Sequence, residues 1–439
     1  MTKKRLVGVW VTAAAVCSCL AVTPVVVPES VAVSQDAGTH VVSVTYDLAG
    51  VCGIVTLDIL TNGVSIGAVN FTNVTGDVNR KVEPGKGRRI TWRPFETWGG
   101  HRLETGALSV NVTAWATNAP PPYRVVDLKN PAPEHHRYYA SAEAVPLGVT
   151  NHVYKTDKLV MRRIFASGIL WRMGDADVDQ VMTSGKNGNM VPLCADDVSR
   201  FVVLTNDYYM GIYPVTQGQW ELAYSQYGVS GSMKNPSVYK GPDRAVHPVE
   251  YVAWVKVRGE GDGENVDNWP VNSNWPVNGH AVNSSRFLGK MRAYTKIMFD
   301  FPTEAQWEFA CRAGTTGTNN VDGVSLDETA WHSGLTDTSQ EVGLKRPNAW
   351  GLYDMLGNVE EWVLDRLGTK PVPADGTAVV EPVGATATTG NRIRKGGAVL
   401  RHNDNNAYWC RPGMTSTGWS QRAEHQCLGF RLWSPAVAP

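Results

Sequence analysis

The chain lacks a net charge. Its 439 residues carry 41 Lys and Arg against 41 Asp and Glu, and no long basic run interrupts this balance. Recruitment of nucleic acid or anionic lipid needs a positive field, so we expect no nucleic acid partner. Beyond its N-terminus the chain also lacks a long apolar stretch, so we expect no integral membrane segment after removal of a leader.

Several catalytic signatures are missing as well. No Ser lies in a nucleophile elbow, and no glycine-rich loop is arranged to hold a phosphate. His332, His402 and His425 lie in the later part of the chain, but they lack the spacing of a ligand set. The sequence therefore predicts neither a hydrolase nor a nucleotide enzyme, and we identify no catalytic residue.

Cysteine is scarce, with seven residues in the chain. Cys17 and Cys19 fall in the apolar N-terminal stretch, and the remaining cysteines are Cys52, Cys194, Cys311, Cys410 and Cys427. In an exported protein these thiols can pair, and an odd number leaves at least one free or joined to another molecule.

The N-terminus has the pattern of a secretory signal. The basic stretch Met1–Arg5 precedes an apolar run from Leu6 to Val27. We predict a signal peptide over residues 1–34 and an exported protein, in the periplasm, at the cell surface or secreted. A retained membrane anchor is one alternative, and a lipoprotein signal around Cys17 and Cys19 is another.

Residues 38–118 show short alternating runs of apolar and polar residues. The runs are separated by turn signals such as Thr61-Asn-Gly63, and they are 41–46, 53–59, 88–92 and 107–115. They predict a small immunoglobulin- or fibronectin-like β-sandwich, used as a spacer or packing module, with ligand binding as the alternative. Proline residues at 120–122 predict an extended linker over residues 119–155.

The rest of the chain, residues 156–435, is rich in Trp and in single Gly residues, which predicts a loop-rich α+β domain. Helices are expected at 216–225, 285–298 and 303–312. In the last of these, Thr303 is placed to cap the N-terminus and Glu304 lies in the first turn.

Six ordered motifs carry a family resemblance. They are Arg172-Met-Gly174, the run 209–220, the run 247–254, Phe301-Pro-Thr-Glu-Ala-Gln-Trp307, the run 348–362 with Gly-Asn-Val-Glu-Glu-Trp, and Gly429-Phe-Arg431. Together they resemble the formylglycine-generating enzyme, or sulfatase-modifying factor, family over roughly residues 160–433. The resemblance implies an α+β fold related to C-type lectins.

The resemblance also implies two structural features. Asn358 and Glu361, with the carbonyl of Val359, would hold a structural calcium ion, which needs oxygen ligands. The alternative is that Asn358 and Glu361 only hydrogen-bond the turn. Cys311 and Cys410 match a cysteine pair that is bridged in some members of the family.

The resemblance fails where the family's chemistry is performed. Formylglycine-generating enzymes hold copper(I) through two cysteines placed just after the Gly-Gly pair, because soft thiolates suit that ion. Here Arg401 and Asn406 stand at those positions. We therefore expect no copper and a pseudoenzyme in respect of formylglycine formation.

Two classes of function follow, with one special case. The first is a binding or structural scaffold that recognises a protein, peptide or glycan through the polar and aromatic segment from Arg401 to Gln426. The candidate ligand surface consists of Arg401, His402, Asn403, Asn406, Trp409 and Trp419. The second is a metal-dependent enzyme that oxidatively modifies exported proteins. The special case is a variable ligand-binding protein of the kind made by diversity-generating retroelements.

Overall fold

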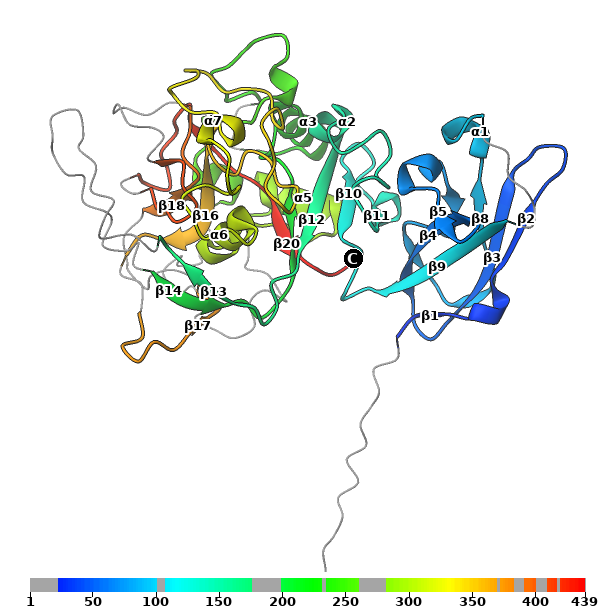
Figure 1. Ribbon diagram of the computed structural model, residues 1–439. Coiled ribbons are helices and arrows are strands. Elements are labelled where there is room, and N and C mark those ends of the chain that lie inside the picture. The colour runs from blue at the N-terminus through cyan, green and yellow to red at the C-terminus, as the bar shows by residue number, and fades with distance from the viewer. Residues whose placement is uncertain are drawn as a thin grey trace, which may run out of the picture.

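A computed structural model describes residues 23–100, 107–175, 199–230, 234–259, 282–368, 372–382, 391–399, 409–416 and 419–438. An antiparallel β region formed by the N-terminal part lies beside a larger mixed α+β domain (Figure 1). Within these residues no helix has the length and apolar character needed to cross a bilayer.

Two antiparallel sheets form the N-terminal β region. The first contains β1 (Val25–Val26), β2 (Ala32–Gln35), β3 (Val42–Ala49), β6 (Thr75–Gly76) and β8 (Gly85–Trp92). The second contains β4 (Gly53–Thr61), β5 (Val64–Ser65), β7 (Lys81–Val82) and β9 (Leu108–Ala116). Alternate residues of β3 are buried, as the period of a strand requires, and they share one core with residues of β4. The strand predictions are confirmed, while the immunoglobulin-like class stays a prediction.

The predicted signal peptide, residues 1–34, overlaps two strands of this structure and stays a prediction. Both β1 and β2 lie before residue 36, and both pair with β3. Val33 lies opposite Val44 in that ladder, so removal of residues 1–34 would take two strands out of the sheet. Valines suit a strand as well as the apolar part of a signal, so the sequence pattern alone does not distinguish the two.

The predicted linker also contributes to the fold. Within residues 119–155 lie β10 (Tyr123–Asp127) and β11 (Arg137–Tyr139), with η3 (Pro133–His135) between them. They belong to a five-stranded sheet in the order β11-β10-β12-β15-β20, whose other members are β12 (Lys158–Ile164), β15 (Tyr208–Gly211) and β20 (Trp433–Pro435). Val125 and Val126 are buried in the core of the larger domain. The proline-rich stretch therefore leads directly into a core strand.

Two three-stranded sheets complete the larger domain. One joins β13 (Leu170–Met173), β14 (Arg200–Val203) and β17 (Val379–Val380). The other places β16 (Glu360–Arg366) between β18 (Arg392–Lys395) and β19 (Leu428–Gly429), and all residues of β16 are buried. Sheet pairing thus brings the Gly-Asn-Val-Glu-Glu-Trp motif beside the Gly-Phe-Arg motif near the C-terminus.

The longer helices occur where the sequence predicts them. They are α3 (Gln217–Tyr227), α5 (Phe287–Thr295) and α6 (Glu304–Arg312), and the shorter ones are α1 (Pro94–Thr97), α2 (Val153–Thr156), α4 (Trp254–Val257) and α7 (Leu326–Thr329). Thr303 caps α6 as expected: its hydroxyl accepts from the Gln306 amide at 3.2 Å, and the Gln306 side chain accepts from the Thr303 amide at 2.9 Å.

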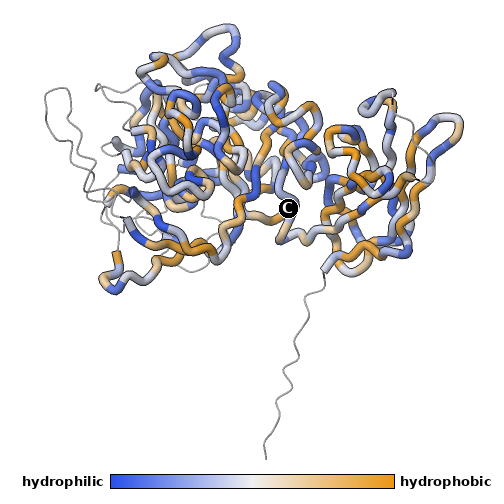
Figure 2. Tube along the Cα trace, in the orientation of Figure 1, coloured by the Kyte–Doolittle hydropathy of each residue, from blue (hydrophilic) through white to orange (hydrophobic). Residues whose placement is uncertain are grey.

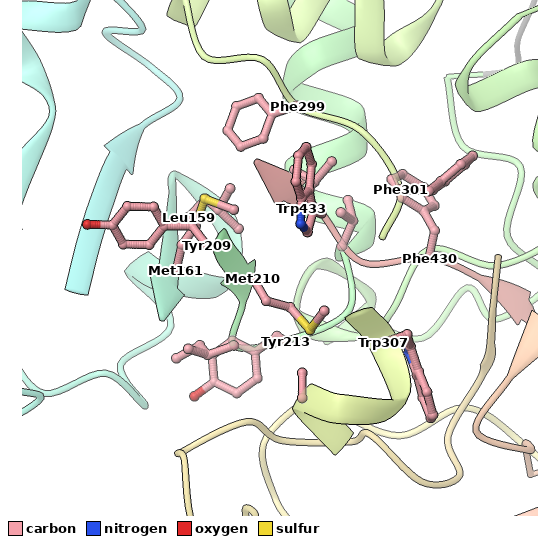
Figure 3. Close-up of a cluster of buried hydrophobic side chains, with 14 of the residues drawn as sticks. Leu159, Met161, Tyr209, Met210, Tyr213, Phe299, Phe301, Trp307, Phe430 and Trp433 are labelled. Atoms are coloured by element: carbon pink, nitrogen blue, oxygen red, sulfur yellow. The ribbon is translucent and has the colours of Figure 1, made fainter. Parts of the chain in front are cut away.

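Aromatic side chains from distant parts of the chain fill the core of the larger domain. Figure 3 shows Tyr209 of β15, Trp307 of α6 and Trp433 of β20 in one buried cluster. The rings of Phe301 and Phe430 meet edge to face, with centroids 5.6 Å apart. Apolar stretches run through the strands of both parts of the chain in Figure 2. The buried aromatics therefore hold together a domain whose regular elements are short.

We predict that Thr303→Ala lowers the free energy of unfolding by about 1 to 2 kcal/mol, because the cap of α6 loses its hydroxyl acceptor. Denaturant unfolding followed by circular dichroism measures the change. Thr150→Ala, at an exposed loop position, is the matched control and should stay within about 0.5 kcal/mol of the unmodified protein. Equal effects of the two substitutions would contradict the capping role.

Candidate ligand-binding surface

The loop that precedes β16 is fixed by its backbone. Gly357 and Asn358 both have positive φ, at 75° and 61°. A Cβ at Gly357 would lie 2.2 Å from the carbonyl oxygen of Trp331, so only glycine fits there. The Asn358 side chain accepts from the Gln340 amide and donates to the Gln340 carbonyl, both at 3.0 Å. Asn358 thus joins two loops.

A buried ion pair lies directly below this loop. Glu361 is 1% exposed, and its two carboxylate oxygens accept hydrogen bonds from Arg431 at 2.8 to 3.0 Å. The indole nitrogen of Trp307 donates to the same carboxylate at 2.7 Å. Arg431 also donates to the carbonyls of Gly211 and Tyr353, each at 2.9 Å. Both carboxylate oxygens of Glu361 are thus engaged by protein donors, so Glu361 is the counter-ion of Arg431 rather than a free metal ligand.

Calcium binding at this loop stays a prediction. Both side chains proposed as ligands, Asn358 and Glu361, are engaged by protein groups. Among the described residues, His, Cys, Asp and Glu side chains do not gather in groups of three or more that could hold a metal. The geometry therefore favours the second role considered for Asn358 and Glu361, which is to hydrogen-bond the loops around them.

More buried charges extend from this pair toward the C-terminal segment. Arg394 of β18 lies 2.5 Å from the carboxylate of Glu360, and the Ser416 hydroxyl donates to Glu360 at 2.7 Å. Lys395 lies 3.4 Å from Glu308 of α6. Arg312, in the next turn of the same helix, donates to Glu308 at 2.8 Å. The positive and negative groups alternate, which compensates part of the cost of burying them.

Buried polar and charged residues also hold the segment 409–416, which follows residues 400–408 in the sequence. The Thr415 hydroxyl donates to Glu304 at 2.6 Å, and Arg411 lies 3.2 Å from Asp175. Arg411 and Asp175 are both buried. The segment 409–416 is therefore held to the core by α6 and by the end of β13.

Above this base lies a cluster of aromatic and cationic side chains. The guanidinium of Arg394 lies 4.3 Å from the ring centroid of Trp419, a cation–π distance. The His425 ring is 4.6 Å from the same indole, and its Nδ1 lies 3.0 Å from the sulfur of Cys427. We call Arg394, Trp419 and His425 the Trp419 stack. Trp419 is half-buried.

Tyr251 borders the Trp419 stack in an unusual conformation. Its φ is 63°, which is strained for a bulky residue, and its amide donates to the His425 carbonyl at 3.0 Å. The preceding residue, Glu250, is 1% exposed and accepts from the Tyr239 amide at 3.0 Å. Burial raises the pKa of Glu250 to about 7. Strain and a raised pKa together mark this edge as a candidate functional position.

The candidate surface residues divide into two groups. Arg401, His402, Asn403 and Asn406 lie outside the described residues. Trp409 and Trp419 are described, and Trp419 takes part in the stack. Sequence reasoning missed Arg394 and Tyr251. An Arg in a strand beside a Gly-Gly pair gave no sign of a ring contact, and no local pattern predicts a positive φ at a tyrosine.

The two cysteines of the expected disulfide lie inside the larger domain. Cys311 is a free thiol, and Cys311 and Cys410 are both buried in the core of the larger domain. Burial raises the pKa of the Cys311 thiol well above its usual range, so this thiol is protonated at neutral pH and is a poor nucleophile or metal ligand. Pairing with Cys410 stays a prediction.

Fold and site define a loop-rich α+β domain in which a Gly-Asn-Val-Glu-Glu-Trp loop is held by a C-terminal Gly-Phe-Arg segment. The chain belongs to the family described as the sulfatase-modifying factor enzyme 1-like domain, whose model matches residues 179–435. This match confirms the family predicted from the motifs.

Curated relatives cover parts of the chain. The chaperone protein LppX of Paenibacillus barcinonensis is 28% identical over 210 residues, which is 36% of this chain and 62% of that protein. The formylglycine-generating enzyme of Streptomyces coelicolor is 30% identical over 151 residues, 31% of this chain and 46% of the enzyme. The chain thus spans less than two thirds of the length of each of these relatives.

Two solved structures match over most of their own length. Treponema denticola variable protein 1 matches with a TM-score of 0.44 and 21% identity, covering 64% of this chain and 96% of that one. PvdO from Pseudomonas aeruginosa matches with a TM-score of 0.43 and 20% identity, covering 63% of this chain and 94% of PvdO.

We predict that Glu361→Gln lowers the free energy of unfolding by about 3 kcal/mol, because Arg431 then stays buried without its counter-charge. The loss should be equal in EDTA and in 1 mM calcium, as measured by denaturant unfolding. The control Asp157→Asn removes an exposed pair with Lys129 and should cost less than about 1 kcal/mol. A calcium-dependent stabilisation that disappears in Glu361→Gln would instead identify Glu361 as a ligand.

The raised pKa of Glu250 predicts a pH dependence. Between its unfolded value of 4.5 and its folded value of about 7, the native state binds the proton more tightly, so stability falls as pH rises. We expect this carboxyl to remove about 3 kcal/mol between pH 4.5 and 7.5. Unfolding curves are measured at both pH values for Glu250→Gln and for the exposed control Glu83→Gln. Glu250→Gln should lose this pH dependence of the unfolding free energy, and Glu83→Gln should keep it. Parallel pH profiles for Glu250→Gln and the unmodified protein would refute it.

Proposed function

We propose that the chain is a ligand-binding member of the sulfatase-modifying factor family. In this proposal the ligand is a protein, peptide or glycan, and it binds to the surface formed by the Trp419 stack and the segment from Arg401 to Gln426. The observation that carries the proposal is the stack itself, in which the Arg394 guanidinium lies 4.3 Å from the half-buried Trp419 ring.

Two features support the proposal: a buried ion pair that holds Arg394 in place, and polar residues at 401–406 that can make varied contacts. Arg394 is held by Glu360 at 2.5 Å, and Ser416 is held by the same carboxylate. A tryptophan held in place by such a base loses little conformational entropy on binding. Tryptophan and arginine are also the residues that most often dominate binding energy at interfaces. The Asn- and His-containing residues 401–406 add polar groups suited to variable contacts.

The competing function is oxidative modification of exported proteins, in the manner of a formylglycine-generating enzyme. The names of several relatives favour it. Against it stand Arg401 and Asn406, which occupy the positions of the copper-binding thiolates and offer no soft ligand. Cys311 is buried and protonated, so it does not replace them. We infer that copper is not a cofactor of this chain.

Two further elements of the proposal concern location and diversity. We infer that the protein is exported, by a leader confined to residues before Val25, because β1 and β2 belong to the folded sheet. The immunoglobulin-like class of the N-terminal β region, acting as a spacer, is part of the same proposal. The special case of a diversity-generated variable protein requires a near-copy template repeat beside the gene, and its absence would exclude that case.

A binding screen tests the proposed function. Purified protein without the leader is applied to a glycan array and to a displayed peptide library, and the affinity of each hit is measured. We expect Trp419→Ala to weaken a genuine ligand about thirtyfold, the effect of removing a dominant aromatic contact of about 2 kcal/mol. Phe201→Ala, which removes an exposed aromatic of the β13–β14–β17 sheet, is the matched control and should change nothing.

Oxidase activity toward a cysteine peptide would contradict the proposal. The same protein is titrated with copper(I) under reducing conditions and then incubated in air with a Cys-x-Pro-x-Arg peptide. Mass spectrometry reports any conversion of the cysteine to an aldehyde. Tight copper binding with conversion would mean that other residues replace the missing thiolates and that the chain is an oxidase. Ligands that bind Trp419→Ala and the unmodified protein equally would also refute the proposed surface.

A further inference from the structure

A cavity of about 440 Å³ lies where the N-terminal β region meets the turn that follows β11. Its walls come from β4, from the connection that contains β5 and η2 (Ala68–Phe71), and from residues 140–144. This volume falls within the range of small-molecule sites, which often form where two parts of a chain meet. The cavity is separate from the Trp419 stack, and the inference drawn from it does not depend on the proposed function.

Hydrogen bonds fix the walls of this cavity relative to each other. The amide of Tyr138, in β11, donates to the carbonyl of Asn79 at 2.8 Å. The amide of Asn79 donates to the carbonyl of Val55 in β4 at 2.7 Å. Asn79 itself lines the cavity and has a φ of 55°. The bonds therefore tie the turn after β11 to the second N-terminal sheet, and the cavity is preformed.

The lining combines an apolar wall with negative charge. Ala68, Val69 and Val74 supply apolar surface, and Val69 is 61% exposed, while Asp58 and Glu143 supply carboxylates. The described lining contains no Lys or Arg. Asp58 is half-buried and accepts from the Ser65 hydroxyl at 2.7 Å, which orients its carboxylate, and Glu143 is exposed. A ligand with a phosphate or carboxylate would be repelled here.

The arginines closest in sequence to the lining are engaged elsewhere. Arg80 lies 2.8 Å from Asp77, and Arg137 donates to the Glu134 carbonyl at 2.7 Å. Neither residue lines the cavity. The carboxylates of Asp58 and Glu143 are thus not neutralised by a lining cation, and they attract a positive group next to an apolar wall.

We propose that this cavity binds a small organic cation with an apolar body, of the arylalkylammonium class. The ammonium group lies between Asp58 and Glu143, and the apolar body lies against Ala68, Val69 and Val74. The ligand is recognised by charge at one end and by burial of apolar surface at the other. The lining residues, between Thr56 and Ala144, lie outside residues 179–435, which the family model matches.

Titration of the full mature chain with 2-phenylethylamine tests the proposal, with binding followed by calorimetry. The neutral analogue 2-phenylethanol and the anion 3-phenylpropanoate have similar size. We expect the amine to bind at least about fivefold more tightly than the alcohol, the worth of one partly exposed charge pair. The anion should not bind. Equal affinity for amine and alcohol, or no binding of the amine at 10 mM, would overturn the proposal.

Variants locate the site. The double substitution Asp58→Asn with Glu143→Gln keeps the shape of the cavity and should weaken amine binding about tenfold without changing alcohol binding. Glu83→Gln, an exposed carboxylate of the same region, is the control and should bind the amine normally. Ser141→Trp, which fills the cavity, should abolish binding of both. Thermal unfolding confirms that each variant is folded before titration.

Two results would assign the cavity differently. Unchanged amine affinity in the double variant would place the amine elsewhere and overturn the proposal. An acetylated Ala-Lys-Ala peptide that binds with Asp58 and Glu143 dependence, while 2-phenylethylamine does not bind, would also overturn it. The cavity would then receive a lysine side chain of a protein partner.

Discussion

The contact between Glu361 and Arg431 is the interaction on which the larger domain depends. The two residues are 70 positions apart, they are both buried, and they are joined by hydrogen bonds of 2.8 to 3.0 Å. Arg431 continues to the carbonyl of Gly211 in β15, and Trp307 of α6 donates to Glu361. A domain with short strands and many loops has few regular hydrogen bonds between distant segments, so this pair replaces them with charge-assisted ones.

The candidate surface is built outward from that pair in layers. Glu360, next to Glu361, points to Arg394, and Arg394 stacks on Trp419. Buried charges of Arg394, Lys395 and Arg411 hold residues 391–399 and 409–416, the described segments on either side of residues 400–408. In the proposed function this rigid base positions the side chains that contact the ligand, as scaffolds position functional groups in other proteins.

Local patterns in the sequence predicted local structure well. The four expected strand segments correspond to β3, β4, β8 and β9, and the three expected helices to α3, α5 and α6. Long-range pairing was missed where a local pattern has two meanings. The valines at 25–27 fit a signal peptide and a strand equally, and in this structure Val25 and Val26 pair with β3. The prolines at 120–122 indicate extended chain, but β10 directly after them lies in the central sheet.

By itself the sequence determined the family, the positions of the main elements and the absence of the copper-binding thiolates, because these follow from residue identity and short spacing. Only the tertiary structure decided that Glu361 pairs with Arg431, that Tyr251 holds a φ of 63° against His425, and that Asp58 and Glu143 line one cavity. Each of these depends on segments brought together by packing over long sequence separations. A local pattern carries no information on which distant partner completes it.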